Sequence, residues 1–349
     1  VPLTGNDIAA LVCIAALDQH PHPDPIVFKT EVTSSLVARI AETRGAQIVD
    51  DLLVGFKYIG EAIYLLERKG RFRNIEASLE QFAVGVEESH GVLVHTQLRD
   101  KDAAGGALLL AELASQEAAK GRTLIDTLHD AFFQHGVVHN HTTSTIMKGA
   151  VGRSQIEEIM RSYRSEPPAE VGERKVLRWF DRQDPTGPFG GIRSSTDRSS
   201  RDMLVYELED NARIILRPSG TEPKAKIYVE VMGKADTVQQ VGDVRKIIAK
   251  EARDLANAFA YEMLQRAQIS LPKWAMNIND IVSIQEKIRW STELIPLFLT
   301  QFRDTPEEAQ EWLHCQLDSK ARDLLRPGIE AMVQDWVGDS EALLRCFQP

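Results

Sequence analysis

Apolar runs of strand length alternate with stretches of helical periodicity over the first 136 residues, and this alternation restricts the possible folds more than any other feature. A strand that alternates with helices belongs to a mainly parallel sheet covered by helices, because parallel strands need crossover connections. We therefore expect an α/β/α layered domain at residues 1–136. Its predicted helices are Ile8–Leu17, Thr33–Arg44, Gly60–Arg68 and Ala107–Lys120, and its predicted strands are Ile26–Phe28, Gln47–Asp50 and Phe82–Val86.

The pattern changes after His135-Gly136. A strand from Val137 is followed by a helix, a long Gly-, Pro-, Ser- and Arg-rich loop at 184–200, two strands around a short loop, and a helix over Val238–Arg266. This order predicts a smaller α+β domain with a mixed or antiparallel sheet at residues 137–268.

Residues 269–349 are predicted to form a helical extension. Thr305-Pro306-Glu307-Glu308 has the features of a helix start, with a capping hydroxyl, Pro at the first helical position and acids beside the positive helix end. We expect the tryptophans of this segment to pack the extension rather than to bind a ligand. They are four of the five in the chain: Trp274, Trp290, Trp312 and Trp336.

The composition is that of a globular protein, with 43% apolar and 26% charged residues. A net charge of −10 argues against a nucleic-acid or anionic-membrane partner. No apolar run approaches the roughly 20 residues of a membrane span. Three cysteines without metal or redox spacing favour a reduced, cytoplasmic compartment. The start of the chain does not have the pattern of a signal peptide, and we expect a chain entered partway through.

A loop rich in anion-binding groups interrupts two apolar runs at Arg217-Pro218-Ser219-Gly220-Thr221-Glu222-Pro223. Arg217 offers a planar fork of donors, Ser219 and Thr221 add hydroxyls, and Gly220 lets backbone N–H groups approach an anion. Such a loop can wrap a phosphate. A β-hairpin whose turn simply uses Pro and Gly explains these residues about equally well.

A second polar loop, Glu87-Glu88-Ser89-His90-Gly91, follows an apolar strand. If the extended geometry continues, Glu87 and Ser89 point to one side and can clamp neighbouring sugar hydroxyls. A polar turn that ends the strand is the simpler explanation of these residues taken alone.

Three further groups carry charge or metal-binding chemistry. Asp102 is predicted to cap the helix that follows the Arg99–Gly106 segment, which includes Lys101. Lys57 is more simply a surface lysine than a ligand. The histidines at 135, 139 and 141 have no acidic or Cys partner nearby in sequence, so we expect no metal site in this chain.

The two loops closely resemble those of the α-D-phosphohexomutases, the phosphoglucomutase/phosphomannomutase family. The resemblance implies that Arg217, Ser219, Gly220 and Thr221 bind the phosphate that is not transferred. It also implies that Glu87 and Ser89 bind sugar hydroxyls. His90 does not occupy the position of the family's histidine, so no acid–base role is transferred to it.

Two lysine segments extend this resemblance to cover approximately residues 1–268, as the third and fourth domains of a four-domain enzyme. Arg99-Asp100-Lys101-Asp102 is similar to a family segment whose lysine faces the cleft, although Ala103 stands where the family has Gly. Gly55-Phe56-Lys57 is similar to another family segment, so Lys57 is a possible ligand as well.

Two parts that the family needs for phosphoryl transfer have no counterpart here. Neither a Ser-His-Asn-Pro phosphoserine loop nor an Asp-x-Asp-x-Asp metal loop occurs. The resemblance therefore implies a substrate-binding half that works with missing N-terminal domains. Those domains would supply the serine and Mg²⁺, and a hexose 1,6-bisphosphate would be the intermediate.

Hexose phosphate is the expected ligand, and Glu87-Glu88-Ser89 favours phosphoglucomutase over phosphomannomutase. The alternative is a catalytically silent sugar-phosphate-binding or partner-interaction subunit, with the tryptophan-rich extension as its contact surface. We expect this chain by itself to be inactive.

Overall fold

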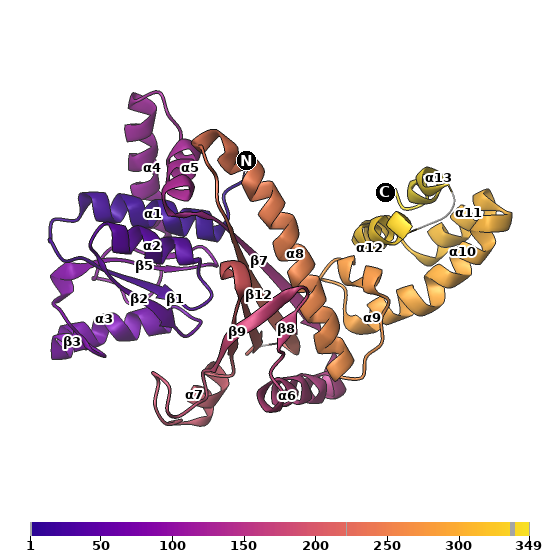
Figure 1. Ribbon diagram of the computed structural model, residues 1–349, viewed down its shortest axis with the longest axis horizontal. Coiled ribbons are helices and arrows are strands. Elements are labelled where there is room, and N and C mark those ends of the chain that lie inside the picture. Colours follow the sequence, from indigo (N-terminus) through magenta and orange to yellow (C-terminus); the bar gives the residue numbers. More distant parts are fainter. Residues whose placement is uncertain (1, 221, 336–338, 349) are drawn as a thin grey trace. The chain divides into compact units, whose positions relative to one another are not determined.

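The computed structural model describes residues 2–220, 222–335 and 339–348 (Figure 1). Contacts along the chain group it into two compact units. Unit 1 comprises Val1–Asn140 with Glu230–Ala252, and unit 2 comprises His141–Val229 with Arg253–Pro349. The predicted limits at residues 136 and 268 stay a prediction, because the family domains need not coincide with contact-based units.

A four-stranded sheet forms the centre of unit 1, in the order β2-β1-β5-β6. The first three strands are parallel, as predicted, and β6 is antiparallel to β5. Every residue of β1 and of β5 is buried, which explains why both strands are nearly continuous apolar runs. The strands are β1 (Ile26–Thr30), β2 (Gln47–Leu52), β5 (Phe82–Glu87) and β6 (Gly91–Leu93).

Helices cover both faces of this sheet (Figure 1). Ile26 and Phe28 point to the face where α3 contributes Ile59 and Ile63 to one buried cluster. Helices α1 and α2 lie on the opposite face. The elements are α1 (Gly5–Gln19), α2 (Ser35–Thr43), α3 (Lys57–Lys69), a short hairpin β3 (Arg71–Phe72) and β4 (Ile75–Glu76), a 3-10 turn Leu79–Gln81, α4 (Ala103–Ala119) and α5 (Leu124–His135).

A six-stranded sheet in the order β7-β12-β11-β10-β9-β8 is the second sheet of the chain. The α+β character predicted for this region is confirmed, since β8, β9, β10 and β11 form successive antiparallel pairs. The elements are β7 (Val137–Ile146), α6 (Gly149–Ser165), β8 (Glu170–Val171), β9 (Arg174–Asp181), α7 (Ser195–Ser200), β10 (Leu204–Leu208), a 3-10 turn Glu209–Asn211, β11 (Arg213–Pro218), β12 (Lys224–Gly233), a 3-10 turn Val238–Gln240 and α8 (Val241–Arg266).

Three aromatic side chains join α6 and α8 to this sheet. Tyr163 of α6 lies 5.1 Å from Phe259 of α8 and 6.2 Å from Tyr206 of β10, measured between ring centroids. All three side chains are fully buried. Buried aromatic groups of this size contribute much of the packing energy of a small domain, so this cluster holds both helices on the sheet.

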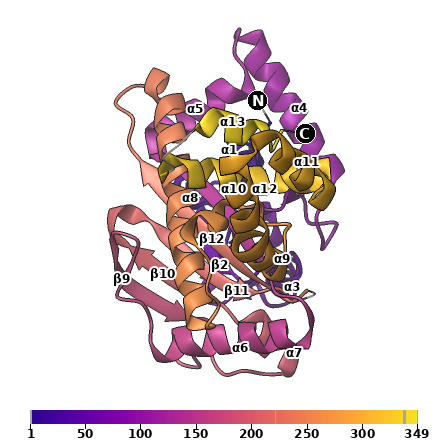
Figure 2. The same ribbon diagram turned by 90° about the vertical axis from the view of Figure 1, so that its right-hand side faces the viewer.

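The segment after α8 is helical, as predicted (Figure 2). Phe298, Phe302 and Phe347 form its aromatic core, with centroid distances of 5.5 and 5.4 Å. Trp290 is buried, whereas Trp336 lies outside the described residues. The elements are a 3-10 turn Lys273–Asn277, α9 (Ile284–Arg289), a π-helical turn Trp290–Leu294, α10 (Ile295–Asp304), α11 (Pro306–Gln316), α12 (Ser319–Met332), a 3-10 turn Val333–Asp335 and α13 (Ser340–Arg345).

One predicted helix start differs in detail. Helix α11 begins at Pro306 with Glu307 and Glu308 in its first turn, as expected. The hydroxyl of Thr305, however, makes no capping bond to this helix and lies 3.5 Å from the carbonyl oxygen of Gln301 in α10. The Thr305 backbone carries the end of one helix into the start of the next, which turns its side chain back.

None of the described helices is both long and apolar enough to cross a bilayer.

Candidate functional site

The strand order of unit 1 reverses at β1, next to the carboxyl ends of its parallel strands. After β1 the chain goes to β2 on one side, and it later returns to β5 on the other side. Open α/β sheets bind ligands where the strand order reverses in this way. The polar residues that follow β1 and β5 are therefore candidates for ligand contacts.

Glu87 is the last residue of β5, and its carboxylate is held almost out of solvent. Its side chain is 8% exposed, and Oε1 lies 3.0 Å from Nζ of Lys101. Gly91 stands opposite in β6, where a Cβ atom would lie only 2.6 Å from the same oxygen. The carboxylate is thus seated between a cation and a position where any Cβ atom would crowd it.

The chain turns directly after Glu87, so the extended geometry under which Glu87 and Ser89 were expected to point to one side does not continue. Residues 88–90 form a turn, in which His90 has a φ of +64°. The Ser89 hydroxyl donates to Oε1 of Glu88 at 3.1 Å. The other oxygen of Glu88 lies 3.5 Å from Oγ1 of Thr30, at the end of β1. The loop therefore presents Ser89 joined to Glu88, beside the reversal point, while Glu87 faces Lys101.

Lys101 and Lys57 have different surroundings. The ammonium of Lys101 lies 5.4 Å from the Phe56 ring centre as well as on Glu87, and its side chain remains half exposed. Lys57 lies over the ring of its neighbour Tyr58 at 4.9 Å, and none of the described residues forms an ion pair with it. The structure brings Lys101 into the Glu87 cluster and leaves Lys57 at the first turn of α3.

Asp102 caps α4, as predicted. Its carboxylate accepts hydrogen bonds from the backbone N–H groups of Ala104 and Gly105, and it lies 3.0 Å from Nε2 of His95. The His95 contact is the main reason that the pKa of this carboxyl lies below its usual value. This cap fixes the start of α4, and with it the position of the preceding Lys101.

Lys29 is a buried cation that sequence reasoning could not assign. It is 1% exposed, and its ammonium donates to the carbonyl oxygens of Thr33 at 3.1 Å and Asp50 at 2.9 Å. A buried charge needs such partners because losing its hydration is costly. Lys29 therefore ties the carboxyl ends of β1 and β2 together. Its position at the end of an apolar strand was the available sequence signal.

The Arg217–Pro223 loop connects β11 to β12 in unit 2. Backbone hydrogen bonds from Ser219 to Lys224 and from Lys224 to Glu222, both 2.8 Å, close the loop. The half-buried Arg217 side chain has no hydrogen-bond or ion-pair partner among the described residues. Gly220 is exposed, with open space where a Cβ would stand. Thr221 lies outside the described residues.

Two lysines of β12, Lys224 and Lys226, follow this loop and were not predicted from the sequence to be ligands. Lys224 and Lys226 lie on the same side of β12, because side chains two apart share a face. Lys224 pairs with Glu222, and this contact lowers the pKa of the Glu222 carboxyl. The end of this hairpin can thus receive an anion through Arg217 without first breaking an ion pair of that residue.

The described part of the chain contains no cluster of side chains that could hold a metal ion. No group of three or more His, Cys, Asp or Glu side chains there is arranged to hold a cation. Mg²⁺ prefers several oxygen ligands in octahedral geometry. The described residues therefore do not fit a resident Mg²⁺ ion.

Comparisons with known proteins identify the family. Residues 4–135 match the phosphoglucomutase/phosphomannomutase alpha/beta/alpha domain III, and residues 186–250 match the C-terminal domain of the same family. A probable phosphomannomutase from Haemophilus influenzae is 33% identical over 63% of this chain and 40% of its own length. A phosphoglucomutase from Staphylococcus epidermidis is 32% identical over 65% of this chain and 40% of its own.

A solved structure supports the fold. The exocytosis-sensitive phosphoprotein pp63/parafusin, a phosphoglucomutase from Paramecium in an open form, aligns with a TM-score of 0.50. The alignment has 15% identity and covers 78% of this chain and 43% of that one.

Both matched domain models belong to the same family. The chain belongs to the phosphoglucomutase/phosphomannomutase family, and its matched regions are domain III and the C-terminal domain. It spans about 40% of the length of the curated relatives that it matches.

Proposed function

We propose that this chain is the substrate-binding C-terminal half of a phosphohexomutase, which interconverts hexose 1-phosphate and hexose 6-phosphate. Its family membership supports a phosphohexomutase-related function. Phosphoglucomutase is favoured over phosphomannomutase because of the Glu87-Glu88-Ser89 sequence. The cytoplasm is the proposed compartment, which agrees with the free thiols of Cys13, Cys315 and Cys346.

The sugar-binding part of the proposal rests on Glu87 and Ser89. A carboxylate accepts hydrogen bonds from two neighbouring sugar hydroxyls, and a serine hydroxyl can donate or accept. Lys101 pairs with Glu87 and holds its carboxylate in one position, and the half-exposed ammonium can also meet an anionic substrate. This buried carboxylate at the reversal point of the sheet is the observation that carries the proposal.

The phosphate-binding part rests on Arg217, Ser219, Gly220 and Thr221. The Arg217 guanidinium, which has no ion-pair partner among the described residues, can bind phosphate oxygens in a bidentate manner. The open space at Gly220 allows an anion to approach the backbone. Holding the non-reacting phosphate would orient the sugar, and the same groups would serve for both orientations of a hexose 1,6-bisphosphate.

The proposal assigns no transfer step to this chain. A phosphoserine loop and Mg²⁺ would belong to N-terminal domains, and the residues that the structure describes do not fit the metal. The chain therefore contributes binding and orientation only, and its partners would be the hexose phosphate and those domains.

Calorimetry with glucose 1-phosphate and mannose 1-phosphate, together with a coupled turnover assay, tests this function. The chain is expected to bind hexose phosphate without converting it, and Glu87→Gln should weaken the binding. Turnover by the chain alone, or equal binding by the Glu87→Gln variant, would contradict the proposal. Stronger binding of the mannose ester would reverse the proposed substrate preference.

A further inference from the structure

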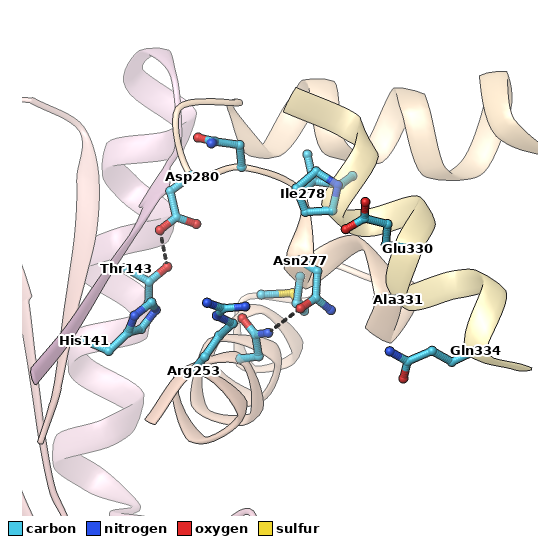
Figure 3. A pocket seen from close by; sticks show the side chains of 13 residues that line it. His141, Thr143, Arg253, Asn277, Ile278, Asp280, Glu330, Ala331 and Gln334 are labelled. Atoms are coloured by element: carbon cyan, nitrogen blue, oxygen red, sulfur yellow. Dashed lines mark hydrogen bonds between the residues drawn. The ribbon is translucent and has the colours of Figure 1, made fainter. Parts of the chain in front are cut away.

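A cavity of about 490 Å³ lies within unit 2 and belongs to neither loop described above (Figure 3). Its volume falls in the range of small-molecule sites. The walls come from β7, α8, the turn around residues 276–280 and the end of α12 with the residues that follow it. The helical extension therefore completes a cavity that β7 and α8 begin.

The sequence spacing explains why polar side chains meet here. His141 and Thr143 are two residues apart on β7 and share a face. Arg253 and Asn257 are four residues apart on α8 and lie one above the other. Figure 3 shows the His141, Arg253 and Asp280 side chains gathered around the same space.

The two carboxylates that line the cavity are already compensated. Asp280 accepts a hydrogen bond from the Thr143 hydroxyl at 2.6 Å and one from the Ser144 backbone at 3.2 Å, and the buried Lys287 ammonium lies 3.8 Å away. Glu330 pairs with Arg326 at 2.9 Å. The acidic side chains therefore leave no unmatched negative charge that would require a bound cation.

Arg253 is the charge that remains unmatched. It lines the cavity, and none of the described residues forms an ion pair or a side-chain hydrogen bond with its guanidinium. Burial is the main reason that the pKa of the His141 imidazole lies below its usual value, with Asp280 opposing this effect and Arg253 adding to it. At neutral pH His141 is thus an uncharged ring that offers a donor and an acceptor.

The amide groups add hydroxyl-binding capacity. Asn257 donates to Asn277 at 3.0 Å, which leaves the Asn257 side-chain oxygen without a partner among the described residues. The Asn279 side-chain oxygen accepts from the Ile281 backbone, and none of the described residues accepts a hydrogen bond from the Asn279 NH₂ group. These free amide groups suit ligand hydroxyls, which can both donate and accept.

From this arrangement we propose that the cavity binds a small hydroxylated anion. Its phosphate or carboxylate group would pair with Arg253 and hydrogen-bond to His141, and its hydroxyls would meet Asn257 and Asn279. Because the extension supplies part of the walls, occupancy of the cavity would stabilise the extension against α8 by mass action.

The test uses the full chain with Arg217→Ala, so that the predicted phosphate loop does not contribute. Glycerol 3-phosphate and gluconate serve as the phosphate and carboxylate probes, and glycerol serves as the uncharged one. Binding is measured by calorimetry and by the rise in the unfolding temperature. Arg253→Ala and Arg253→Lys are compared with Arg345→Ala, which changes an exposed arginine of α13 outside the cavity.

At least one anionic probe should bind with a 1:1 stoichiometry, and glycerol should not. Arg253→Ala should weaken binding about tenfold or more, Arg253→Lys less, and Arg345→Ala not at all. Response to only one anion identifies the group as phosphate or carboxylate. No saturable binding of either anion, or equal affinity in Arg253→Ala, would overturn the proposal. Arg253 is exposed, so its variants should unfold at the parent temperature without ligand.

Discussion

Gly91 in β6 lies directly against the Glu87 carboxylate of β5, so close that a methyl group on Gly91 would come within 2.6 Å of Glu87 Oε1. A strand glycine normally weakens a sheet, because it adds entropy to the unfolded chain and packs no side chain. Here its absent side chain leaves the space in which a buried acid sits beside Lys101. Glycine at position 91 thus makes room for the Glu87 carboxylate between the two strands.

Gly91→Ala is therefore expected to displace Glu87. The free energy of unfolding should fall by about 1–3 kcal/mol, the usual cost of overpacking, and hexose-phosphate binding should weaken. Urea unfolding and calorimetry measure the two effects. Gly242→Ala is the control, because a Cβ there meets no neighbour, and its stability should stay the same or rise by up to about 1 kcal/mol. Equal behaviour of both variants would contradict the proposed packing.

Lys101→Met tests whether the ion pair with Glu87 belongs to the site. The Lys101 side chain is 50% exposed, but the carboxylate with which it pairs is only 8% exposed, so the substitution leaves a nearly buried charge without its cation. We expect the free energy of unfolding in urea to fall by about 1–3 kcal/mol and the binding of glucose 1-phosphate to weaken several-fold. Lys57→Met should have a smaller effect on affinity, because Lys57 does not join the Glu87 cluster. Unaltered affinity in the Lys101 variant would exclude that lysine from the site.

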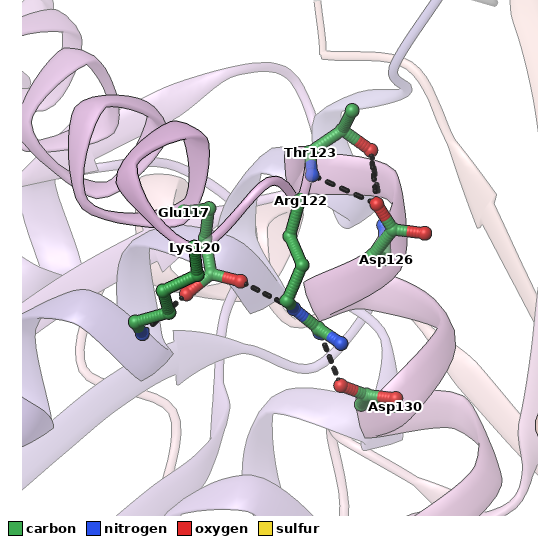
Figure 4. Close-up of polar contacts among 6 residues, drawn as sticks. All are labelled: Glu117, Lys120, Arg122, Thr123, Asp126 and Asp130. Carbon is green, nitrogen blue, oxygen red and sulfur yellow. Dashed lines mark hydrogen bonds and ion pairs between the residues drawn. The ribbon is translucent and has the colours of Figure 1, made fainter.

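Glu117 is expected to give a pH-dependent contribution to stability. This nearly buried carboxylate accepts from Lys120 at 2.7 Å and from Arg122 at 2.8 Å, and Arg122 also pairs with Asp130 (Figure 4). The Lys120 bond first, and then the Arg122 bond, lower the Glu117 pKa to about 2. Because the folded pKa is depressed, the stabilisation is complete above the unfolded value of about 4.5 and is lost as pH falls toward 2.

Glu117→Gln should accordingly destabilise the chain at pH 7 by about 1 kcal/mol or more, and the difference from wild type should shrink between pH 4.5 and 2. Urea titrations across this range measure it. Glu112→Gln is the matched control on the same helix, since Glu112 is exposed and without a partner among the described residues. A pH-independent difference for Glu117→Gln would show that its charge is not responsible.

The α/β region and the α+β region could be predicted from the sequence because buried apolar residues recur with the period of a helix or a strand. Sequence reasoning missed α5, although Thr123 and Asp126 form a capping box that can be read as Ser/Thr-x-x-acid. It missed β9 because exposed Leu177 and Trp179 are mixed with charged residues. The bond between Thr143 and Asp280 joins residues 137 positions apart, and no local pattern reveals such a contact.

The candidate site shows the same limit. Residues of both loops could be named from their chemistry, but the direction of the Ser89 side chain depends on a turn in which His90 has positive φ. Non-glycine residues rarely adopt a positive φ, so an alternating strand pattern does not predict this turn. The role of Gly91 likewise depends on the register between β5 and β6.

Deleting the chain after Ile269 is expected to lower stability and solubility. The deletion removes Asp280 from Thr143 and Ser144, and it uncovers apolar side chains that the extension buries in unit 2. Thermal unfolding and light scattering compare the truncated chain with the full one. A truncated chain that is equally stable and equally soluble would mean that the extension does not support the fold.

Calorimetric titration of Arg217→Ala with glucose 1-phosphate is the most direct test of the central claim that the β11–β12 loop binds the phosphate of a hexose ester. Arg178→Ala is the matched control, because Arg178 is an exposed strand arginine of the same sheet that pairs with Glu207. Loss of a charged hydrogen bond predicts an affinity roughly 10- to 150-fold weaker for Arg217→Ala and unchanged for Arg178→Ala. Wild-type affinity in the Arg217 variant would contradict the claim.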